Sequence, residues 1–321
     1  FFQPKKLFLL KDGSLEISYL KMCNDEIDAD FGDILEVDTI KMAVTPQFNI
    51  RQRISKSDYL LKVGTMRDHI QRGDIYEANF CMEFYAENAE IEPFEIYQKL
   101  NSISKPPFAA FFRNNNGYIL SASPERYLKK SGNKLISQPI KGTARRSIDP
   151  IEDQTIKLQL VASEKERAEN IMIVDLVRND LSKTAARGSV EVEELCGVNT
   201  FRQVHHLVST VVSELATGFS SVDAIRTTFP MGSMTGAPKI SAMNIIEKLE
   251  ETKRGVYSGS VGYFTPEGDF DFNVIIRSIL YNKQQKYVSF SVGSAITSEA
   301  SAEAEYEECM LKARAMLEVL S

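Results

Sequence analysis

The chain has 321 residues, of which 43% are hydrophobic and 26% charged, so it can bury the core of one large domain or of two closely packed halves. Its net charge of −6 excludes an overall basic field, and we expect neither nucleic acid nor a membrane surface as a partner. The four cysteines are too scattered for a paired metal site. We interpret them as thiols of a cytoplasmic protein.

The first part of the chain alternates short apolar runs with turn residues, and Asp12-Gly13 predicts a β-hairpin. We expect residues 1–56 to form a short β-rich segment packed on a main domain of residues 57–321. In that domain "SKSDYLLKVGTMRDHIQRGD" has helical spacing, and "IYEANFCMEFYA" is typical of a strand. A helix "PFEIYQKLNSI" and the strands "FAAFFRN" and "YILSASP" are predicted next.

A second hairpin is predicted about Gly132-Asn133, and its register has a chemical consequence. If the loop holds three residues centred on Asn133, Glu125 lies directly opposite Lys141, and a shift of one residue makes the two diagonal neighbours. The hairpin therefore predicts a carboxylate and an amine in one small region.

The remaining elements alternate between helical and strand patterns. Residues 152–182 predict one or two long helices, and "NTFRQVHHLVSTVVSEL" predicts a strand that carries His205 and His206. The pattern then predicts a helix, a glycine-rich loop and a helix, followed by three strands and a final amphipathic helix. The sequences of those strands are "GVYSGSVGYFT", "FNVIIRSILY" and "KYVSFSVGSAI". Periodicity alone indicates only a mixed α and β protein.

Two predicted helices each carry a pair of glutamates at i and i+3, Glu166 with Glu169 and Glu305 with Glu308. This spacing places both carboxylates on one helix face, where they repel each other unless a cation lies between them. Carboxylates without a cluster of cysteine or histidine suit a hard cation such as Mg²⁺. A solvated acidic face is the alternative for either pair.

Three further positions carry chemistry. The loop "FPMGSMTGAPK" ends at Lys239 before a helix, which permits an anion site but does not satisfy the phosphate-loop pattern. Arg277 lies in an apolar strand and needs an anionic partner, either a structural carboxylate or a ligand. His205 is expected to be packed in the core, whereas His206 is an acid, a hydrogen-bond donor or a packing residue.

In the order in which they occur, these segments resemble the chorismate-utilising enzymes. That family includes anthranilate synthase, aminodeoxychorismate synthase, isochorismate synthase and salicylate synthase. The resemblance runs from about Ser57 to the C-terminus. It rests on "GDIYEANF", "SASPERYL", "PIKGTARR", "ERAENIMIVDLVRNDL", "VHHLVST", "FPMGSMTGAPKISAMNIIE", "GVYSGSVGY", "IIRSI" and "EAEYEECMLKARAML". It implies an α+β fold in which two antiparallel β-sheets pack together, flanked by helices.

Two positions divide the family. Lys141 of "PIKGT" matches the aminodeoxychorismate synthases, which use this lysine as a nucleophile, whereas anthranilate synthases carry alanine there. Glu77 departs from both the lysine of the water-using members and the glutamine that is usual in the ammonia-using members. The resemblance thus implies a component I of aminodeoxychorismate synthase, a transferase in the synthesis of 4-aminobenzoate and folate.

The resemblance also implies a mechanism and a set of site residues. Mg²⁺ chelates the ring carboxylate of chorismate, Lys141 attacks ring carbon 2, and Glu125, initially protonated, donates a proton to the hydroxyl that leaves carbon 4. Ammonia then adds at carbon 4 and expels Lys141. This chemistry requires that the pKa of Lys141 be lowered from its usual value. The implied metal residues are Glu169 and Glu308, directly, and Glu166 and Glu305, through water. The other implied site residues are His206, Gly142, Thr143, Tyr257, Arg277, Gly293, Ser294, Ala295, Lys312 and Lys239.

Departures from the family limit these implications. The family's "GAG" reads Gly293-Ser294-Ala295 here, which is expected to crowd the carboxylate site. A tryptophan-binding "LLES" motif and an amidotransferase triad are both absent from the sequence. We therefore expect no feedback by tryptophan, and we expect ammonia to come from a separate glutamine amidotransferase subunit or from solution. Anthranilate synthase is the alternative within the family, and a non-catalytic chorismate-binding regulatory subunit is the alternative from another class.

Overall fold

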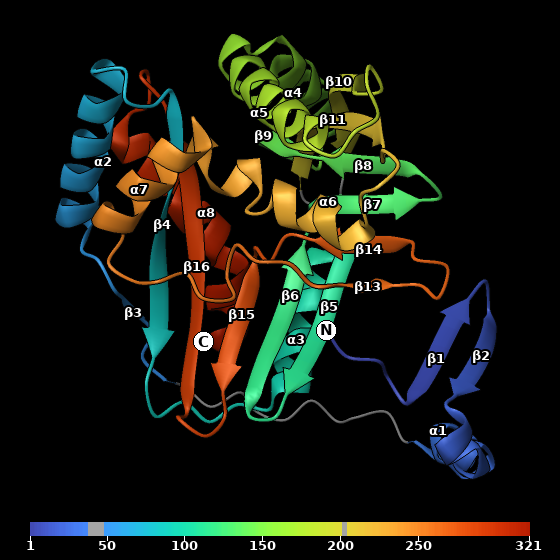
Figure 1. Cartoon of the computed structure of the whole chain (residues 1–321). Helices are drawn as coiled ribbons and strands as arrows, with labels where there is room; N and C mark the ends of the chain where they lie inside the picture. The colour runs from blue at the N-terminus through green and yellow to red at the C-terminus, as the bar shows by residue number, and fades with distance from the viewer. Residues whose placement is uncertain (38–47, 201–203) are drawn as a thin grey trace. The chain divides into compact units, whose positions relative to one another are not determined.

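The computed structural model describes residues 1–37, 48–200 and 204–321, and the chain divides into two compact units, Phe1–Val44 and Thr45–Ser321. The first unit contains the hairpin of β1 (Lys6–Lys11) and β2 (Ser14–Tyr19), followed by the 3₁₀ helix η1 (Lys21–Glu26) and helix α1 (Ile27–Glu36) (Figure 1). Asp12 and Gly13 both have positive φ, as a two-residue hairpin turn requires, so the predicted hairpin is confirmed. The sequence interpretation missed α1, and the packing of residues 1–56 on the main domain stays a prediction.

Two seven-stranded antiparallel sheets form the framework of the second unit. The first sheet has the order β12-β4-β16-β15-β6-β5, with β3 paired to β4, and is the lower sheet in Figure 1. Its strands span Arg51–Gln52 (β3), Glu77–Ala86 (β4), Phe108–Asn114 (β5), Gly117–Ser123 (β6), Gly236–Ala237 (β12), Ser278–Asn282 (β15) and Tyr287–Ile296 (β16).

The second sheet has the order β10-β11-β8-β7-β14-β13, and β9 also pairs with β11. Its strands span Arg126–Ser131 (β7), Lys134–Gln138 (β8), Ile140–Arg145 (β9), Glu191–Thr200 (β10), Val204–Glu214 (β11), Gly262–Phe264 (β13) and Phe270–Asn273 (β14). The α+β class with two antiparallel sheets is therefore confirmed.

Helices contact both sheets. The first sheet is contacted by α2 (Lys56–Gln71), α3 (Pro93–Ser104), α7 (Lys239–Leu249) and α8 (Ala302–Leu320), and the second by α4 (Pro150–Ala162) and α5 (Glu164–Ser182). Helix α6 (Ser221–Thr228) packs against α5, and the short 3₁₀ helix η2 (Gly232–Met234) lies between α6 and α7 in the chain. No helix among the described residues combines the length and the apolar character needed to cross a bilayer.

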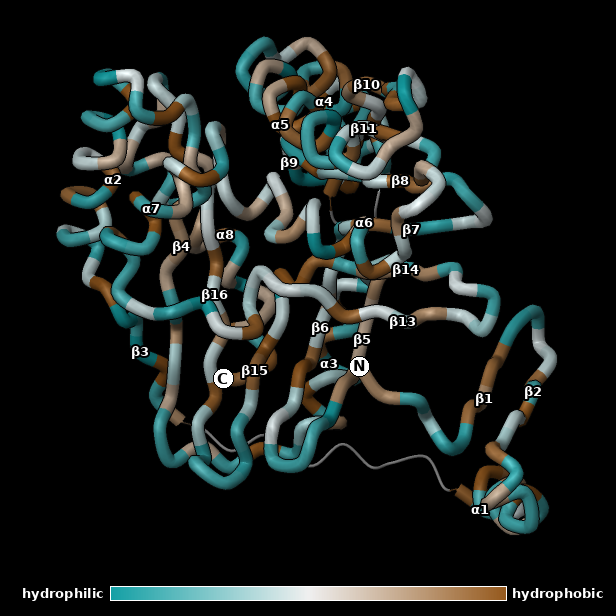
Figure 2. Tube along the Cα trace, in the orientation of Figure 1, coloured by the Kyte–Doolittle hydropathy of each residue, from teal (hydrophilic) through white to brown (hydrophobic). Residues whose placement is uncertain are grey.

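Each sheet has its own hydrophobic core. The first core contains the fully buried Tyr59, Phe80 and Phe290, and the second contains Leu128, Leu135 and Ile173, among others. In Figure 2 the turns at the lower end of the first sheet are teal, whereas long stretches of β4, β15 and β16 are white to brown. Burial of this apolar surface fixes the register of the strands, because a shift of one residue would turn each side chain to the opposite face.

One predicted strand is broken in the structure. The segment "FNVIIRSILY" was expected to be continuous, but β14 ends at Asn273 in the second sheet and β15 begins at Ser278 in the first. Arg277 lies in the break with a φ of 49°, a left-handed conformation that is rare outside glycine. The chain therefore passes from one sheet to the other at Arg277.

The predicted register of the β7–β8 hairpin is wrong. Ser131 pairs with Lys134, so the loop holds two residues and not three. A shift further along pairs Arg126 with Gln138, and Lys141 lies on the next strand, β9, which pairs with β11. Glu125 and Lys141 are therefore not cross-strand partners, and any proximity between them must arise from the tertiary fold.

Candidate active site

A cavity of about 780 Å³ in the second unit contains most of the predicted site residues. Its walls come from both sheets and from α5 and α8, so segments as far apart in the chain as Asn79 and Glu318 meet there. The predicted residues that line it are Glu125, Lys141, Gly142, Thr143, Glu166, Glu169, His206, Tyr257, Arg277, Gly293, Ala295, Glu305, Glu308 and Lys312.

Lys141 lines this cavity as a buried cation. Its Nζ atom lies 2.8 Å from Oε1 of Glu77, and the two side chains are 12% and 1% exposed. Burial alone would lower the pKa of Lys141, but the carboxylates of Glu77, Glu169 and Glu308 together raise it above the usual value. The expectation of a lowered pKa is therefore wrong for this structure, in which Lys141 is an ammonium.

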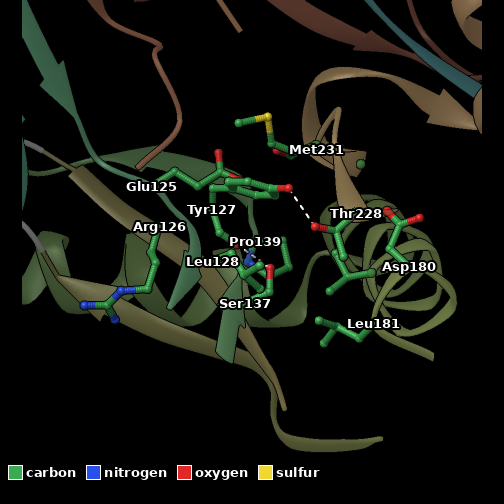
Figure 3. A pocket seen from close by; sticks show the side chains of 13 residues that line it. Glu125, Arg126, Tyr127, Leu128, Ser137, Pro139, Asp180, Leu181, Thr228 and Met231 are labelled. Carbon is green, nitrogen blue, oxygen red and sulfur yellow. Dashed lines mark hydrogen bonds between the residues drawn. The ribbon is translucent and has the colours of Figure 1, made fainter. Parts of the chain in front are cut away.

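Glu125 also lines the cavity and is 5% exposed. Burial raises its pKa to about 7, and the cations Lys141 and Arg277 only partly oppose this. The carboxyl group can therefore hold a proton near neutral pH, as the sequence interpretation expected. A small cavity of about 20 Å³ adjoins Glu125, where the hydroxyl of Tyr127 is hydrogen-bonded to that of Thr228 at 2.6 Å (Figure 3).

A second cationic region of the cavity is formed by Arg277 and Lys312. Arg277 lines the cavity. Burial lowers the pKa of its guanidinium, and the negative charge of Glu125 opposes this decrease. Lys312 donates to the carbonyl oxygen of Gly293 at 2.9 Å and pairs with Glu308 at 2.6 Å. Tyr257 is buried in the same wall, and its hydroxyl accepts a hydrogen bond from Cys81. This arrangement can receive a carboxylate.

The two glutamate pairs meet in this cavity, which the sequence could not show. Glu166 and Glu169 come from α5, and Glu305 and Glu308 come from α8. The ammonium of Lys165 connects the helices, since it lies 3.3 Å from Oε1 of Glu305 and 3.9 Å from Oε1 of Glu169. Two cations, Lys165 and Lys312, thus neutralise part of this acidic wall.

The electrostatics of the acidic wall favour an added cation. Burial raises the pKa of Glu169 to about 7 and also raises those of Glu166 and Glu305, and the neighbouring carboxylates add to each shift. For Glu308, burial is outweighed by Lys312 and other lysines, so its pKa is lowered. Three of the four carboxylates are thus poorly stabilised as anions in the cavity.

The donor set fits Mg²⁺, because it consists of carboxylate oxygens beside a cavity that has room for water and for oxygens of a substrate. Within residues 1–37, 48–200 and 204–321, however, no three carboxylate, histidine or cysteine side chains converge closely enough to enclose an ion. A metal ion held in this conformation would have fewer than three of these side chains as direct ligands, and water or substrate oxygens would complete its coordination.

The segment around Lys141 depends on Gly142. This residue has a φ of 87°, and a Cβ atom there would lie 3.0 Å from Oε2 of Glu166 and 3.1 Å from Cδ1 of Leu207. The next residue, Thr143, is hydrogen-bonded to Nδ1 of His206 at 2.9 Å. Burial lowers the pKa of His206 to about 3, so its ring is neutral at physiological pH.

The expected crowding by the Gly293-Ser294-Ala295 variant stays a prediction for one of its two substituted positions. A Cβ atom at Gly293 would lie only 2.5 Å from Sγ of Cys81, so β16 can approach β4 closely only with glycine there. Ser294 is fully buried, is not part of the cavity wall and is hydrogen-bonded to the hydroxyl of Tyr59 at 3.1 Å. Of the two substituted positions, only Ala295 lines the cavity.

Lys239 and His205 lie outside the cavity. The ammonium of Lys239 pairs with Asp180 and donates to the carbonyl oxygens of Thr228 and Pro230, so the predicted anion-binding role of Lys239 is corrected to a structural ion pair. His205 is buried beside Asp153, which confirms the prediction that it is a packed residue.

The sequence interpretation missed some residues of the cavity wall. Lys165 precedes the first glutamate pair, and Asn79 lies two residues after Glu77 on β4. Arg145 ends β9 and Arg146 follows it, and the "ARR" of "PIKGTARR" was the available signal for them. Arg146 lies 2.7 Å from Asp153 in an ion pair, which anchors the wall segment 145–148.

Comparison with known proteins gives consistent results at the levels of family, sequence and fold. The family model described as chorismate binding enzyme matches residues 6–318. The chain is 38% identical over 270 residues to aminodeoxychorismate synthase component 1 of Escherichia coli (strain K12), which covers 84% of this chain and 59% of that protein. It is 39% identical over 285 residues to the probable chloroplastic aminodeoxychorismate synthase of Oryza sativa subsp. japonica, which covers 88% of this chain and 32% of that protein.

Among solved structures, anthranilate synthase component I from Streptococcus pneumoniae TIGR4 superposes with a TM-score of 0.86 and 27% sequence identity. That match covers 97% of this chain and 72% of the other. The chain spans about a third of the length of the rice synthase and about three fifths of the length of the Escherichia coli protein.

Proposed function

Because the chain belongs to the family of chorismate binding enzymes, we propose that it is the chorismate-aminating component of an aminodeoxychorismate synthase. The reaction converts chorismate and ammonia into 4-amino-4-deoxychorismate and water, for the synthesis of 4-aminobenzoate and folate. The names of the bacterial and rice relatives support this proposal. The observation that carries it is Lys141, a buried amine in the same cavity as Glu125, Arg277 and four carboxylates.

Each step of the proposed reaction has a residue in the cavity. Arg277 and Tyr257 receive the enolpyruvyl carboxylate, and Lys312 with the backbone around Gly293 completes this anion site. Lys141 attacks ring carbon 2, the ring double bonds shift, and the carbon 4 hydroxyl leaves as water with the proton of Glu125. Ammonia then adds at carbon 4, the amine of Lys141 is expelled, and Glu125 recovers a proton from the new ammonium group.

Glu169 and Glu308 are the proposed direct ligands of Mg²⁺, with Glu166 and Glu305 bound to it through water. When bound, this metal supplies a Lewis acid and a template for the ring carboxylate of chorismate. The proposal is supported by the four carboxylates that line the cavity and by the raised pKa values of Glu169, Glu166 and Glu305. Apart from the metal, the neutral ring of His206 holds Thr143 beside Lys141.

Ammonia is proposed to come from a separate glutamine amidotransferase subunit, as the word component in the names of the bacterial relatives suggests. A cytoplasmic location is also proposed, in keeping with four cysteines that are all free and buried.

The decisive experiment is an assay of the product with chorismate, Mg²⁺ and ammonium. We expect 4-amino-4-deoxychorismate, together with a Lys141 adduct that mass spectrometry detects when ammonium is omitted. Lys141→Ala should abolish both, whereas Lys134→Ala, which removes an exposed lysine of β8, should leave both unchanged. Anthranilate as the product would instead assign the activity named for the Streptococcus pneumoniae structure, and isochorismate or salicylate would also refute the proposal. Full activity of Lys141→Ala, with no adduct, would refute the role of Lys141.

A further inference from the structure

The ion pair of Lys141 with Glu77 raises a chemical problem for the proposed reaction. An ammonium group has no lone pair and cannot attack carbon, so Lys141 must lose a proton before it reacts. Burial would favour that loss, but the charged groups that face Lys141 oppose it. These groups are Glu77 on β4, Glu169 on α5 and Glu308 on α8, whereas Glu125, which lines the same cavity, is protonated in the proposed starting state.

Glu77 is the proton acceptor that the geometry offers. Among the residues that the structure describes, Oε1 of Glu77 is the one hydrogen-bond acceptor of the Lys141 ammonium, at 2.8 Å. No ion pair within 4.0 Å joins Lys141 to Glu169 or to Glu308. Glu77 does not line the cavity, so its carboxylate contacts the reacting amine without facing the substrate.

The second oxygen of Glu77 is free to take up a proton. Oε2 is buried and has no hydrogen-bond partner in the described part of the chain, and the side chain is 1% exposed. A proton added to this oxygen therefore displaces no hydrogen bond that Oε2 makes in the described part of the chain. Moving one proton from Nζ to Glu77 converts a buried ion pair into a neutral pair and leaves the net charge of the site unchanged.

The backbone holds Glu77 in place. Glu77 begins β4 and pairs with Ala237 of β12, and Gly236 allows the two strands to approach closely. A Cβ atom at Gly236 would lie 2.1 Å from the carbonyl oxygen of Glu77 and 2.8 Å from Cα of Ala78. The carboxylate is thus attached to a strand whose position is fixed by packing.

We propose that Glu77 accepts the proton of Lys141 when chorismate binds and returns it when the covalent adduct breaks down. This inference rests on the proposed nucleophilic role of Lys141. Transfer gives a free amine and a neutral Glu77, and attack on carbon 2 gives a secondary ammonium. Expulsion by ammonia releases Lys141 as a neutral amine, which takes back the proton of Glu77. Each group therefore ends the cycle in its starting state.

The test is the pH dependence of adduct formation in the whole chain, measured with chorismate and Mg²⁺ in the absence of ammonium. In the unaltered protein the proton moves within the pair, whereas in Glu77→Gln it must leave to solvent. We therefore compare the two rates of adduct formation as a ratio, that of Glu77→Gln divided by that of the unaltered protein. This ratio should rise tenfold per pH unit until Lys141 is deprotonated in Glu77→Gln. The ionisation of Glu125 affects both rates equally and cancels in this ratio.

Two matched variants complete the design. Glu77→Asp keeps a carboxylate on β4 and should give a ratio that does not change with pH, which also serves as the test if Glu77→Gln fails to fold. Glu83→Gln removes another carboxylate of β4, one that pairs with Arg53 outside the cavity, and should give a ratio of about one throughout.

Three outcomes would overturn the inference. A pH-independent ratio in Glu77→Gln, even at a reduced rate, would mean that Glu77 only positions Lys141. A ratio that rises with pH in Glu77→Asp as steeply as in Glu77→Gln would show that the carboxylate is not the acceptor. Absence of a Lys141 adduct in the unaltered protein would overturn the proposed function as well, so the two failures are distinguishable.

Discussion

The raised pKa of Glu125 predicts that replacement of this residue changes stability in a pH-dependent way. Glu125 is 5% exposed, and burial raises its pKa from 4.5 to about 7. The folded state therefore binds a proton more tightly than the unfolded state. Protonation of Glu125 therefore contributes to the unfolding free energy at low pH, and this contribution is lost as the pH rises from 4.5 through about 7.

The size of the effect follows from the pKa difference. At about 1.4 kcal/mol per pKa unit, the shift makes ionised Glu125 cost roughly 3 kcal/mol of unfolding free energy at high pH. Between about pH 5.5 and about pH 8.5, roughly 2 kcal/mol of this cost develops. The glutamine of Glu125→Gln cannot ionise, so the unfolding free energy of this variant does not include this cost. Relative to the unaltered protein, it should gain about 2 kcal/mol between the two pH values.

Denaturant unfolding of both proteins at the two pH values measures this gain. Other titrating groups act in both proteins, so they cancel in the difference. Glu90→Gln is a suitable control, because a hydrogen bond from Lys286 lowers the pKa of this exposed carboxylate and its ionisation is complete at both pH values. A difference between Glu125→Gln and the unaltered protein that is the same at both pH values would refute the argument that burial controls Glu125.

The remaining predictions concern the ion pair, the glycine and the metal. Lys141→Met leaves the carboxylate of Glu77 buried and unpaired and should lower the unfolding free energy by about 3–5 kcal/mol, and the added change Glu77→Gln should restore most of it in denaturant unfolding. Gly142→Ala should cost about 1–3 kcal/mol in the same assay, because the φ of 87° is strained for alanine and its Cβ atom crowds Glu166. Mg²⁺ at 100 times its dissociation constant should raise the unfolding free energy by about 2.7 kcal/mol. Glu169→Gln should remove most of this gain. An equal gain in Glu169→Gln and in the unaltered protein would exclude Glu169 as a ligand.

The sequence predicted most of the helices and strands of the main domain, because their patterns are local. The helix at Lys56–Gln71 follows from its apolar spacing and its Ser55 cap, and the α8 helix from its amphipathic repeat. The strands β10, β14 and β15 were harder to predict from the sequence. β10 has mostly exposed side chains and was missed, and the separation of β14 from β15 depends on a change of sheet at Arg277 that periodicity does not encode.

By itself, the sequence identified the residues capable of chemistry and, through its resemblance to a family, the candidate reaction. The tertiary structure decided which of them meet. It brought the Glu166 and Glu305 pairs to one cavity, placed Lys239 outside it, and paired Lys141 with Glu77 instead of aligning it with Glu125 across a hairpin. The physical reason is that side-chain types and periodicity are local properties, whereas burial, charge pairing and the resulting pKa values depend on segments that are distant in the chain.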